Sequence, residues 1–235
     1  MNPKRTSSWI MVGLAAILVS SRVLLSIVPT DLALELQQQY LPWPVLAVTI
    51  VLGFIGWRLS LKINIPELWA GPHPARSRLI YPALLGLAIG IFWVLTDLYM
   101  QRQAHASFPG VIFLYTYAAI FAEVINRLFL ATFLVWLVSI VILRGRALGR
   151  TYWTVAILIT LWTSLASAYG TYQASGGNPS WLDVFSSFGL AAVFEPVAFY
   201  LYRRYGFLAP LVMHYAFYVI WHMLWGGLVM QVLQS

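Results

Sequence analysis

Long apolar runs separated by short polar connections organise nearly the whole chain. A helix of about 20 apolar residues crosses the hydrocarbon core of a bilayer, because each residue adds about 1.5 Å of length. The pattern therefore predicts helices that span a membrane, and the short connections favour one helical bundle over separate domains. The seven candidate spans cover residues 9–29, 42–61, 79–99, 109–143, 151–170, 182–202 and 207–231.

The fourth run, residues 109–143, is about 35 residues long and exceeds what one crossing needs. Either it forms one steeply tilted helix, or it protrudes from the bilayer, and Arg127 inside it marks a candidate local break. The pattern leaves open whether this run is one helix or two.

Composition agrees with a membrane location. Of the 235 residues, 61% are hydrophobic and only 9% are charged, a balance that is typical of a polytopic membrane protein and not of a soluble domain. The net charge of +7 does not indicate nucleic-acid binding, because the arginines stand in short connections between apolar runs. The absence of cysteine excludes disulfides, thiolate metal sites and a cysteine nucleophile.

The basic residues predict an orientation, because Lys and Arg in short connections resist translocation. With the N-terminus in the cytoplasm, 11 of the 14 basic residues fall on the cytoplasmic side, and the uncharged segment 171–180 faces the other side. We interpret residues 1–235 as one all-α integral membrane domain, with the bacterial plasma membrane as its expected location. The 11 residues are Lys4, Arg5, Arg58, Lys62, Arg76, Arg78, Arg144, Arg146, Arg150, Arg203 and Arg204.

Polar residues interrupt three of the predicted spans. Glu123 and Arg127 stand four positions apart in the fourth span, so they share one helical face and are able to pair. Glu195 precedes Pro196 in the sixth span, and the last span carries a repeat of polar rings every four residues, His214, Tyr218 and His222. A charge in mid-bilayer costs a few kcal/mol on insertion scales, and it is usually retained because it meets a partner, a cavity or a reaction.

Each of these groups has a structural interpretation beside a functional one. The Glu123 and Arg127 pair is either a neutral clamp between helices or part of a reactive site. For Glu195 beside Pro196 a structural role is favoured, because proline frees a helical carbonyl that neighbouring groups satisfy. His214 is an interhelical hydrogen-bond donor or a site residue, and His222 is typical of an aromatic belt.

A carboxylate and an imidazole in a membrane cavity support two kinds of chemistry. The carboxylate is able to activate a water as a general base, with the histidine as its orienting or metal-binding partner. The same pair could relay protons in a transporter. No G-x-S-x-G, H-E-x-x-H or Gly-rich phosphate loop occurs, so the serine-hydrolase, zincin and nucleotide classes are excluded. The residues require no cofactor, and they leave a divalent metal open.

The order of features resembles the CPBP family of intramembrane proteases, which includes the type 2 CAAX prenyl proteases and the bacterial Abi proteins. The resemblance covers residues 108–230. It rests on the run Phe108 to Leu143, then RGRALGR, then TYWTVAILITLWTSLASAYG, then YLYRRYGFLAPLVMHYAFYVIWH. It implies three motifs: E-E-x-x-x-R in one helix, F-x-x-x-H in the next, and H-x-x-x-N in a last helix that is entered through a short basic turn.

Carried over onto this chain, the first motif falls on AEVINR. Its second Glu is Glu123 and its Arg is Arg127, while Ala122 stands at the first Glu position. The second motif falls near Leu165 to Tyr169 and has no histidine. Since the first Glu and the second-motif histidine are the water-activating pair that the resemblance implies, their absence puts hydrolysis in doubt.

The third motif places its histidine on His214, and Tyr218 stands where Asn is usual. The resemblance implies a glutamate-type, metalloprotease-like endopeptidase of the CAAX type that cleaves hydrophobic or prenylated peptides, or an inactive relative. In that scheme Glu123 is the base or a clamp, and Arg127 is its ion-pair partner. His214 is the oxyanion or metal-side donor, and Tyr218 is a hydroxyl substitute for the amide. The rivals are a small membrane transporter and a non-catalytic assembly or immunity protein.

Overall fold

A computed structural model of the chain describes residues 3–28, 42–68, 73–100 and 106–234, and within these residues the only regular structure is helical. Seven helical stretches of the described chain are long and apolar enough to cross a membrane. They confirm the all-α fold class and the seven predicted spans, so the chain is an integral membrane protein with the lipid bilayer around it. The stretches are Thr6–Ile27, Trp43–Ile63, Arg76–Tyr99, Gly110–Ile142, Leu148–Gln173, Trp181–Tyr205 and Leu208–Leu233.

Several spans change helix type along their length. Wider turns with π-helical hydrogen bonding occur in the third, fourth and seventh spans. These segments, and one short 3₁₀ turn after α3, carry the label η. In chain order the elements are α1 (Pro3–Ile27), α3 (Trp43–Ser60), η1 (Leu61–Ile63), η2 (Arg76–Ile80), α4 (Tyr81–Met100), α5 (Gly110–Glu123), η3 (Val124–Ala131), α6 (Thr132–Val135), η4 (Trp136–Ile142), α7 (Leu148–Ala174), α8 (Trp181–Tyr205), α9 (Leu208–Tyr218), η5 (Val219–Val229) and α10 (Met230–Gln234).

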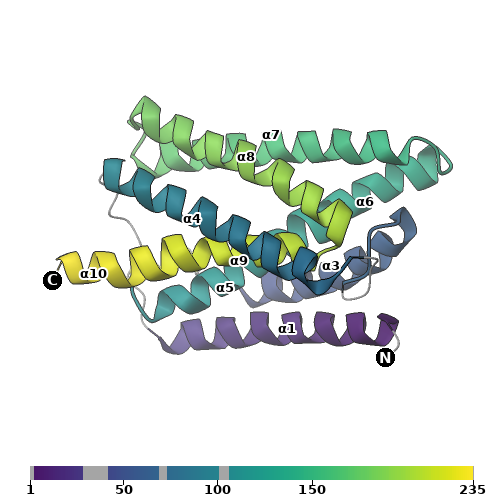
Figure 1. The fold of residues 1–235 in the computed structure, drawn as a ribbon, viewed down its shortest axis with the longest axis horizontal. Coiled ribbons are helices and arrows are strands. Elements are labelled where there is room, and N and C mark those ends of the chain that lie inside the picture. The colour runs from purple at the N-terminus through teal and green to yellow at the C-terminus, as the bar shows by residue number, and fades with distance from the viewer. Residues whose placement is uncertain (1–2, 29–41, 69–72, 101–105, 235) are drawn as a thin grey trace.

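The helices run along the long axis of the molecule (Figure 1). Helices α7 and α8 pack against each other on one side and α1 lies on the opposite side, with α4, α5 and α9 between them. The most extensive remaining contacts join α4 to α9, α1 to α5, and α3 to η3. The two ends of the chain lie at opposite ends of the bundle, as an odd number of spans requires.

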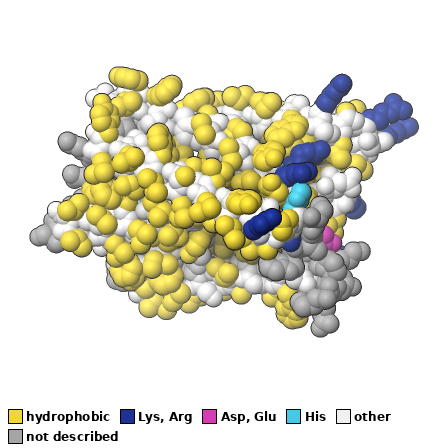
Figure 2. Space-filling view, viewed as in Figure 1, with side chains coloured by type: hydrophobic (Ala, Val, Ile, Leu, Met, Phe, Trp, Pro, Cys, Tyr) yellow, Lys and Arg dark blue, Asp and Glu magenta, His cyan; other side chains and the backbone are white. Residues whose placement is uncertain are grey.

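Lys and Arg side chains gather at one end of the bundle, while the rest of the visible surface is dominated by hydrophobic side chains (Figure 2). At this end, which we call the basic end, α3 and α8 finish and α7 begins (Figure 1). The connections that carry the basic residues, which are every second one along the sequence, therefore meet at one end of the molecule. That this end faces the cytoplasm stays a prediction. The residues of the basic end are Arg58, Lys62, Arg76, Arg78, Arg144, Arg146, Arg150, Arg203 and Arg204.

The fourth span is one continuous helix from Gly110 to Ile142, so the question of one helix or two is settled in favour of one. It does not break at Arg127. Instead, the turns widen from Val124 onward. In an α-helix, side chains four positions apart point in directions that differ by about 40°, and the wider π turns compensate for this difference. As a result, every fourth residue stays buried, with exposed fractions of 0, 0, 1, 0 and 0% at Glu123, Arg127, Ala131, Val135 and Ser139.

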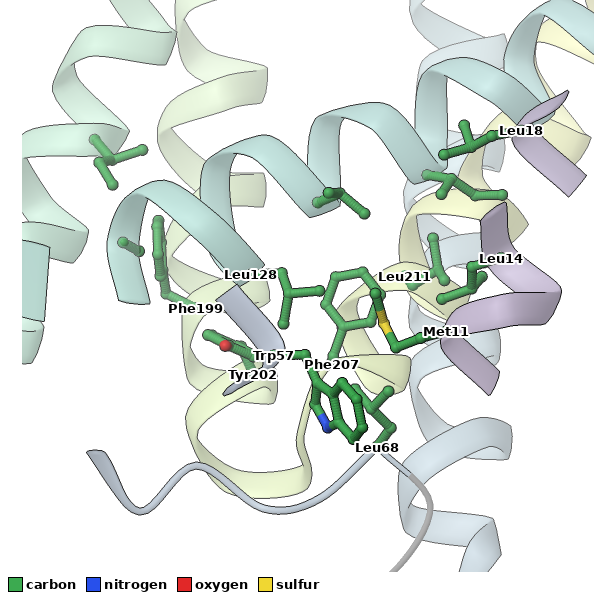
Figure 3. Close-up of a cluster of buried hydrophobic side chains, with 14 of the residues drawn as sticks. Met11, Leu14, Leu18, Trp57, Leu68, Leu128, Phe199, Tyr202, Phe207 and Leu211 are labelled. Carbon is green, nitrogen blue, oxygen red and sulfur yellow. The ribbon is translucent and has the colours of Figure 1, made fainter. Parts of the chain in front are cut away.

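The main apolar core joins residues of α1, α3, α5, η3, α7, α8 and α9, and Figure 3 shows part of it. Trp57 and Phe207 pack in this core together with Leu128, which the fourth span contributes through η3 (Figure 3). Leu68, from the connection that follows α3, is also buried in this core. The core therefore fixes the helices that carry the charged residues.

Two glycines allow helix backbones to approach closely. A Cβ placed on Gly56 of α3 would lie 2.1 Å from the carbonyl oxygen of Leu128, and one on Gly86 of α4 would lie 2.1 Å from the carbonyl oxygen of Met213. Small residues permit such approaches between membrane helices. These contacts hold η3 and α9, on which three of the predicted site residues, Arg127, His214 and Tyr218, stand.

Candidate functional site

Four charged or ionisable residues from three spans meet in the interior. Glu123 ends α5, Arg127 lies on η3, Glu195 lies on α8 and His214 lies on α9. We call these four residues the charged cluster. All of them are buried, with 8% exposure at most.

Arg127 joins the two carboxylates. Its Nη1 donates to Glu123 Oε1 at 2.5 Å, and its Nη2 donates to Glu195 Oε2 at 2.6 Å. The guanidinium carbon also lies 5.2 Å from the centre of the Phe199 ring, within the range of a cation–π interaction. Arg127 is therefore an electrostatic link between the fourth and sixth spans.

His214 contacts Glu123 directly. The imidazole Nδ1 lies 2.8 Å from Glu123 Oε1, although the two residues are 91 positions apart in the sequence. Because a carboxylate only accepts hydrogen bonds, Nδ1 carries the proton in this contact. The structure thus brings together three of the four predicted site residues.

Tyr218, the fourth predicted site residue, meets the cluster through its ring. The Tyr218 and His214 rings make an edge contact with 4.5 Å between their centres, and the Phe194 ring makes a similar contact with His214 at 4.8 Å. His222 lies farther along the last span and stacks on Tyr115 at 3.7 Å. Tyr218 therefore holds the imidazole by packing, and His222 belongs to an aromatic layer next to the cluster.

The charges of the cluster balance when His214 is protonated. Two carboxylates and one guanidinium leave one negative charge, which an imidazolium at His214 cancels. Breaking a buried ion pair by removing one partner costs about 3–5 kcal/mol, because the other charge stays uncompensated. A balanced cluster is thus the arrangement that a low-dielectric interior favours.

Access to the cluster is uneven. The side chains of Glu195 and His214 are 11% and 10% exposed, whereas those of Glu123 and Arg127 are 0% and 1% exposed. Glu123 Oε2 is buried and has no hydrogen-bond partner among the described residues. Glu195 Oε1 and His214 Nε2 make no hydrogen bond within the described chain either, and they belong to the two side chains that the protein leaves partly uncovered. The reachable edge of the cluster is therefore formed by Glu195 and His214.

This edge lies where the packing of α7 and α8 changes. All buried residues of α8 lie between Phe194 and Tyr202, and none is found in its first half, Trp181 to Val193. In the described part of α7 no residue after Ser164 is buried. The two half-helices contact each other, as in the 2.7 Å hydrogen bond from Thr171 to Ser187, and their described residues are partly buried or exposed. Glu195 and His214 stand at the inner limit of this loosely packed half.

The position proposed for the second motif does not face the cluster. Leu165 and Tyr169 are 60% and 61% exposed on the outer surface of α7. The inward face of this helix carries Thr160 and Ser164 instead. A shift of one residue turns a helical side chain by about 100°, so the alignment of this motif places its residues on the outward side of α7.

The donor set does not fit a metal ion. The described residues contain no group of three or more His, Asp or Glu side chains that could hold one. Although two carboxylates and an imidazole approach each other, the guanidinium of Arg127 lies between the carboxylates and takes up one oxygen of each. A cation already occupies the position that a divalent metal would need.

Glu195 is the residue whose importance the sequence understated. It supplies the second ion-pair partner of Arg127 from 68 positions away in the sequence, and sequence reasoning favoured a structural role for it. Its one signal in the sequence is an acid within an apolar span, immediately before a proline.

No family model matches the chain, and no curated protein or solved structure matches it. The class of protein is therefore defined by the fold and the site alone. It is an integral membrane helical bundle with a buried, charge-paired cluster.

Proposed function

We propose that this chain is a CPBP-like intramembrane endopeptidase that hydrolyses a peptide bond in hydrophobic or prenylated peptides, with the charged cluster as its site. The observation that carries the proposal is the 2.8 Å contact between Glu123 and His214, two residues that the resemblance assigns to separate motifs. A clamp between two helices would need only the Arg127 ion pairs. The additional imidazole supplies a group that gives and takes protons.

The residue types suit hydrolysis of an amide. A carboxylate acts as a general base toward water, and positioned donors stabilise the negative charge that develops on the carbonyl oxygen. Both effects are larger in a site from which bulk water is excluded. Because Arg127 takes up one oxygen of each carboxylate, the proposal relies on acid–base and electrostatic catalysis by the chain's own residues.

The surroundings of the cluster favour an apolar substrate. Beyond Glu195 and Ser164, α8 and α7 expose large hydrophobic side chains such as Phe185, Val193 and Leu165. A substrate that reached the cluster along these half-helices would pass apolar side chains and acyl chains, which a transmembrane or prenylated peptide tolerates and a soluble peptide does not.

The test is a cleavage assay on the purified full-length protein in lipid nanodiscs. The probes are quenched fluorescent peptides in matched prenylated and unprenylated forms. We expect the wild type to cleave them, and we expect His214→Ala and His214→Gln to lower kcat/KM on the order of 10²- to 10⁴-fold. Two substitutions are used so that a folding defect in one does not decide the result.

The matched control is Glu67→Gln. Glu67 accepts a hydrogen bond from Ser7 at 2.8 Å, in the connection between α3 and η2 that is remote in sequence from the cluster. This variant should cleave like the wild type. Cleavage that persists in both His214 variants would contradict the proposed site.

A second candidate is a relative that keeps the scaffold without hydrolysis. It is favoured by Ala122 at the first Glu position and by the complete burial of Glu123. A wild type that cleaves none of the peptides, yet unfolds cooperatively and is stabilised by the prenylated peptide, would support this candidate.

A further inference from the structure

We infer that Glu195 is the water-activating carboxylate of this site, with His214 as its partner, and that Glu123 and Arg127 position these two groups. The inference rests on the proposed hydrolytic function. It assigns the general base to a residue outside all three motifs of the resemblance, on the sixth span.

The first reason is access. A general base must come within hydrogen-bond reach of the proton that it removes. The Glu123 side chain is 0% exposed, whereas that of Glu195 is 11% exposed, so a substrate and its water meet Glu195 first.

The second reason is the use of the carboxylate oxygens. Glu123 Oε1 already accepts from both Arg127 Nη1 and His214 Nδ1, and its other oxygen is buried. Glu195 is held through Oε2 alone, by Arg127 Nη2, and this leaves Oε1 to accept a hydrogen bond from water. Arg127 thus fixes the orientation of Glu195 without occupying its second oxygen.

The third reason is the orientation of the imidazole. The contact of Nδ1 with Glu123 fixes one edge of the His214 ring, so Nε2 lies on the opposite edge. The ring is only 10% exposed, and Phe194 and Tyr218 pack against it. Glu123 therefore acts on His214 as a positioning carboxylate, and its burial serves that role.

The proposed step balances as follows. Glu195 Oε1 takes a proton from a water while the water oxygen bonds to the peptide carbonyl carbon, and the C=O electron pair moves onto the carbonyl oxygen. The Nε2–H of imidazolium His214 stabilises this oxyanion. When the C=O bond re-forms, the C–N bond breaks, and the proton on Glu195 passes to the leaving nitrogen. The products are a carboxylic acid and an amine, and the cluster returns to its starting state.

The experiment compares Glu195→Gln with Glu123→Gln in the nanodisc assay. Either single change removes one negative charge, and the remaining carboxylate still pairs with Arg127, so neither variant leaves the guanidinium without an ion-pair partner. Thermal unfolding of both provides the folding control. We expect Glu195→Gln to lower kcat on the order of 10²- to 10⁴-fold at unchanged KM. Glu123→Gln, whose amide oxygen still accepts from Nδ1, should lose less than about 10-fold.

Two further readouts separate a base from a structural role. Glu195→Asp, which keeps a carboxylate, should recover part of the activity that Glu195→Gln loses. The fall of kcat/KM at acid pH, which reports the general base, should persist in Glu123→Gln and disappear from the residual activity of Glu195→Gln. Full activity in Glu195→Gln, together with loss in His214→Gln, would overturn this assignment and leave the proposed function standing. A wild type inert toward every peptide would overturn both.

Discussion

Arg127 on the fourth span and Glu195 on the sixth form an ion pair with 2.6 Å between Nη2 and Oε2, inside a part of the bundle where the arginine side chain is 1% exposed. The same guanidinium holds Glu123, so one positive charge organises two acids from different helices. Removing it would leave both carboxylates in a medium that disfavours charge.

Arg127→Met should therefore destabilise the protein by about 3–5 kcal/mol. Unfolding in detergent, followed by circular dichroism against temperature or denaturant, measures this loss. Arg146→Met is the matched control, because Arg146 is exposed in the connection before α7 and its substitution should change stability by no more than about 0.5 kcal/mol. Equal losses in the two variants would contradict the buried link.

The contact between Glu123 and His214 predicts an energetic coupling. In a double-mutant cycle of Glu123→Ala and His214→Ala, the coupling energy should be about 0.5–3 kcal/mol, because contacting residues share one interaction. A parallel cycle of His214→Ala with Glu67→Ala should be additive, since Glu67 bonds to Ser7 in the connection after α3. Additivity in the first cycle would mean that the two groups do not interact in the membrane protein.

The approach of α4 to α9 predicts that Gly86 tolerates no larger residue. A Cβ at this position would lie 2.1 Å from the Met213 carbonyl oxygen, a backbone atom that moves only with its helix. Gly86→Ala should cost about 1–3 kcal/mol of stability and displace His214, the next residue along α9. Gly170→Ala is the control, because its Cβ would meet nothing within 4 Å and alanine is the better helix former.

The orientation predicted from the basic residues is open to a direct test, because the chain contains no cysteine to remove first. Asn178→Cys places a thiol at the exposed turn between α7 and α8, and Arg146→Cys places one at the basic end. We expect a membrane-impermeant maleimide to label Asn178→Cys in intact cells and Arg146→Cys only after permeabilisation. The reverse labelling would invert the topology and leave the fold unchanged.

The sequence was sufficient for the spans because hydrophobic length is a local property. The limits of all seven were predicted to within three residues, and the four-residue spacing of Glu123 and Arg127 indicated their pairing. Local spacing does not determine which helices become neighbours. The second carboxylate on Arg127, Glu195, is supplied by the packing of α8, and no pattern along the chain encodes that contact.

The second motif shows the same limit in another form. Leu165 and Tyr169 have the required spacing, yet they lie on the outward face of α7, while Ser164 one position earlier is fully buried. The lipid-facing and core-facing sides of a membrane span are both apolar, so the sequence shows little periodic difference in hydrophobicity between them. An alignment of the motif that is shifted by one residue therefore looks equally good in the sequence, although it places the motif on a different face of the helix.

The widened turns after Glu123 also determine how the fourth span responds to changes of length. Each residue in these wide turns rotates the chain by less than the about 100° of an α-helix, so the loss of one codon between Val124 and Ala131 is taken up largely by tightening the turns to ordinary α geometry. Val135 and Ser139 would then stay close to their buried positions, whereas the same deletion in an α-helical stretch would turn them toward the lipid. These eight residues thus act as a length reserve of the fourth span, which tolerates a deletion here better than in its α-helical part.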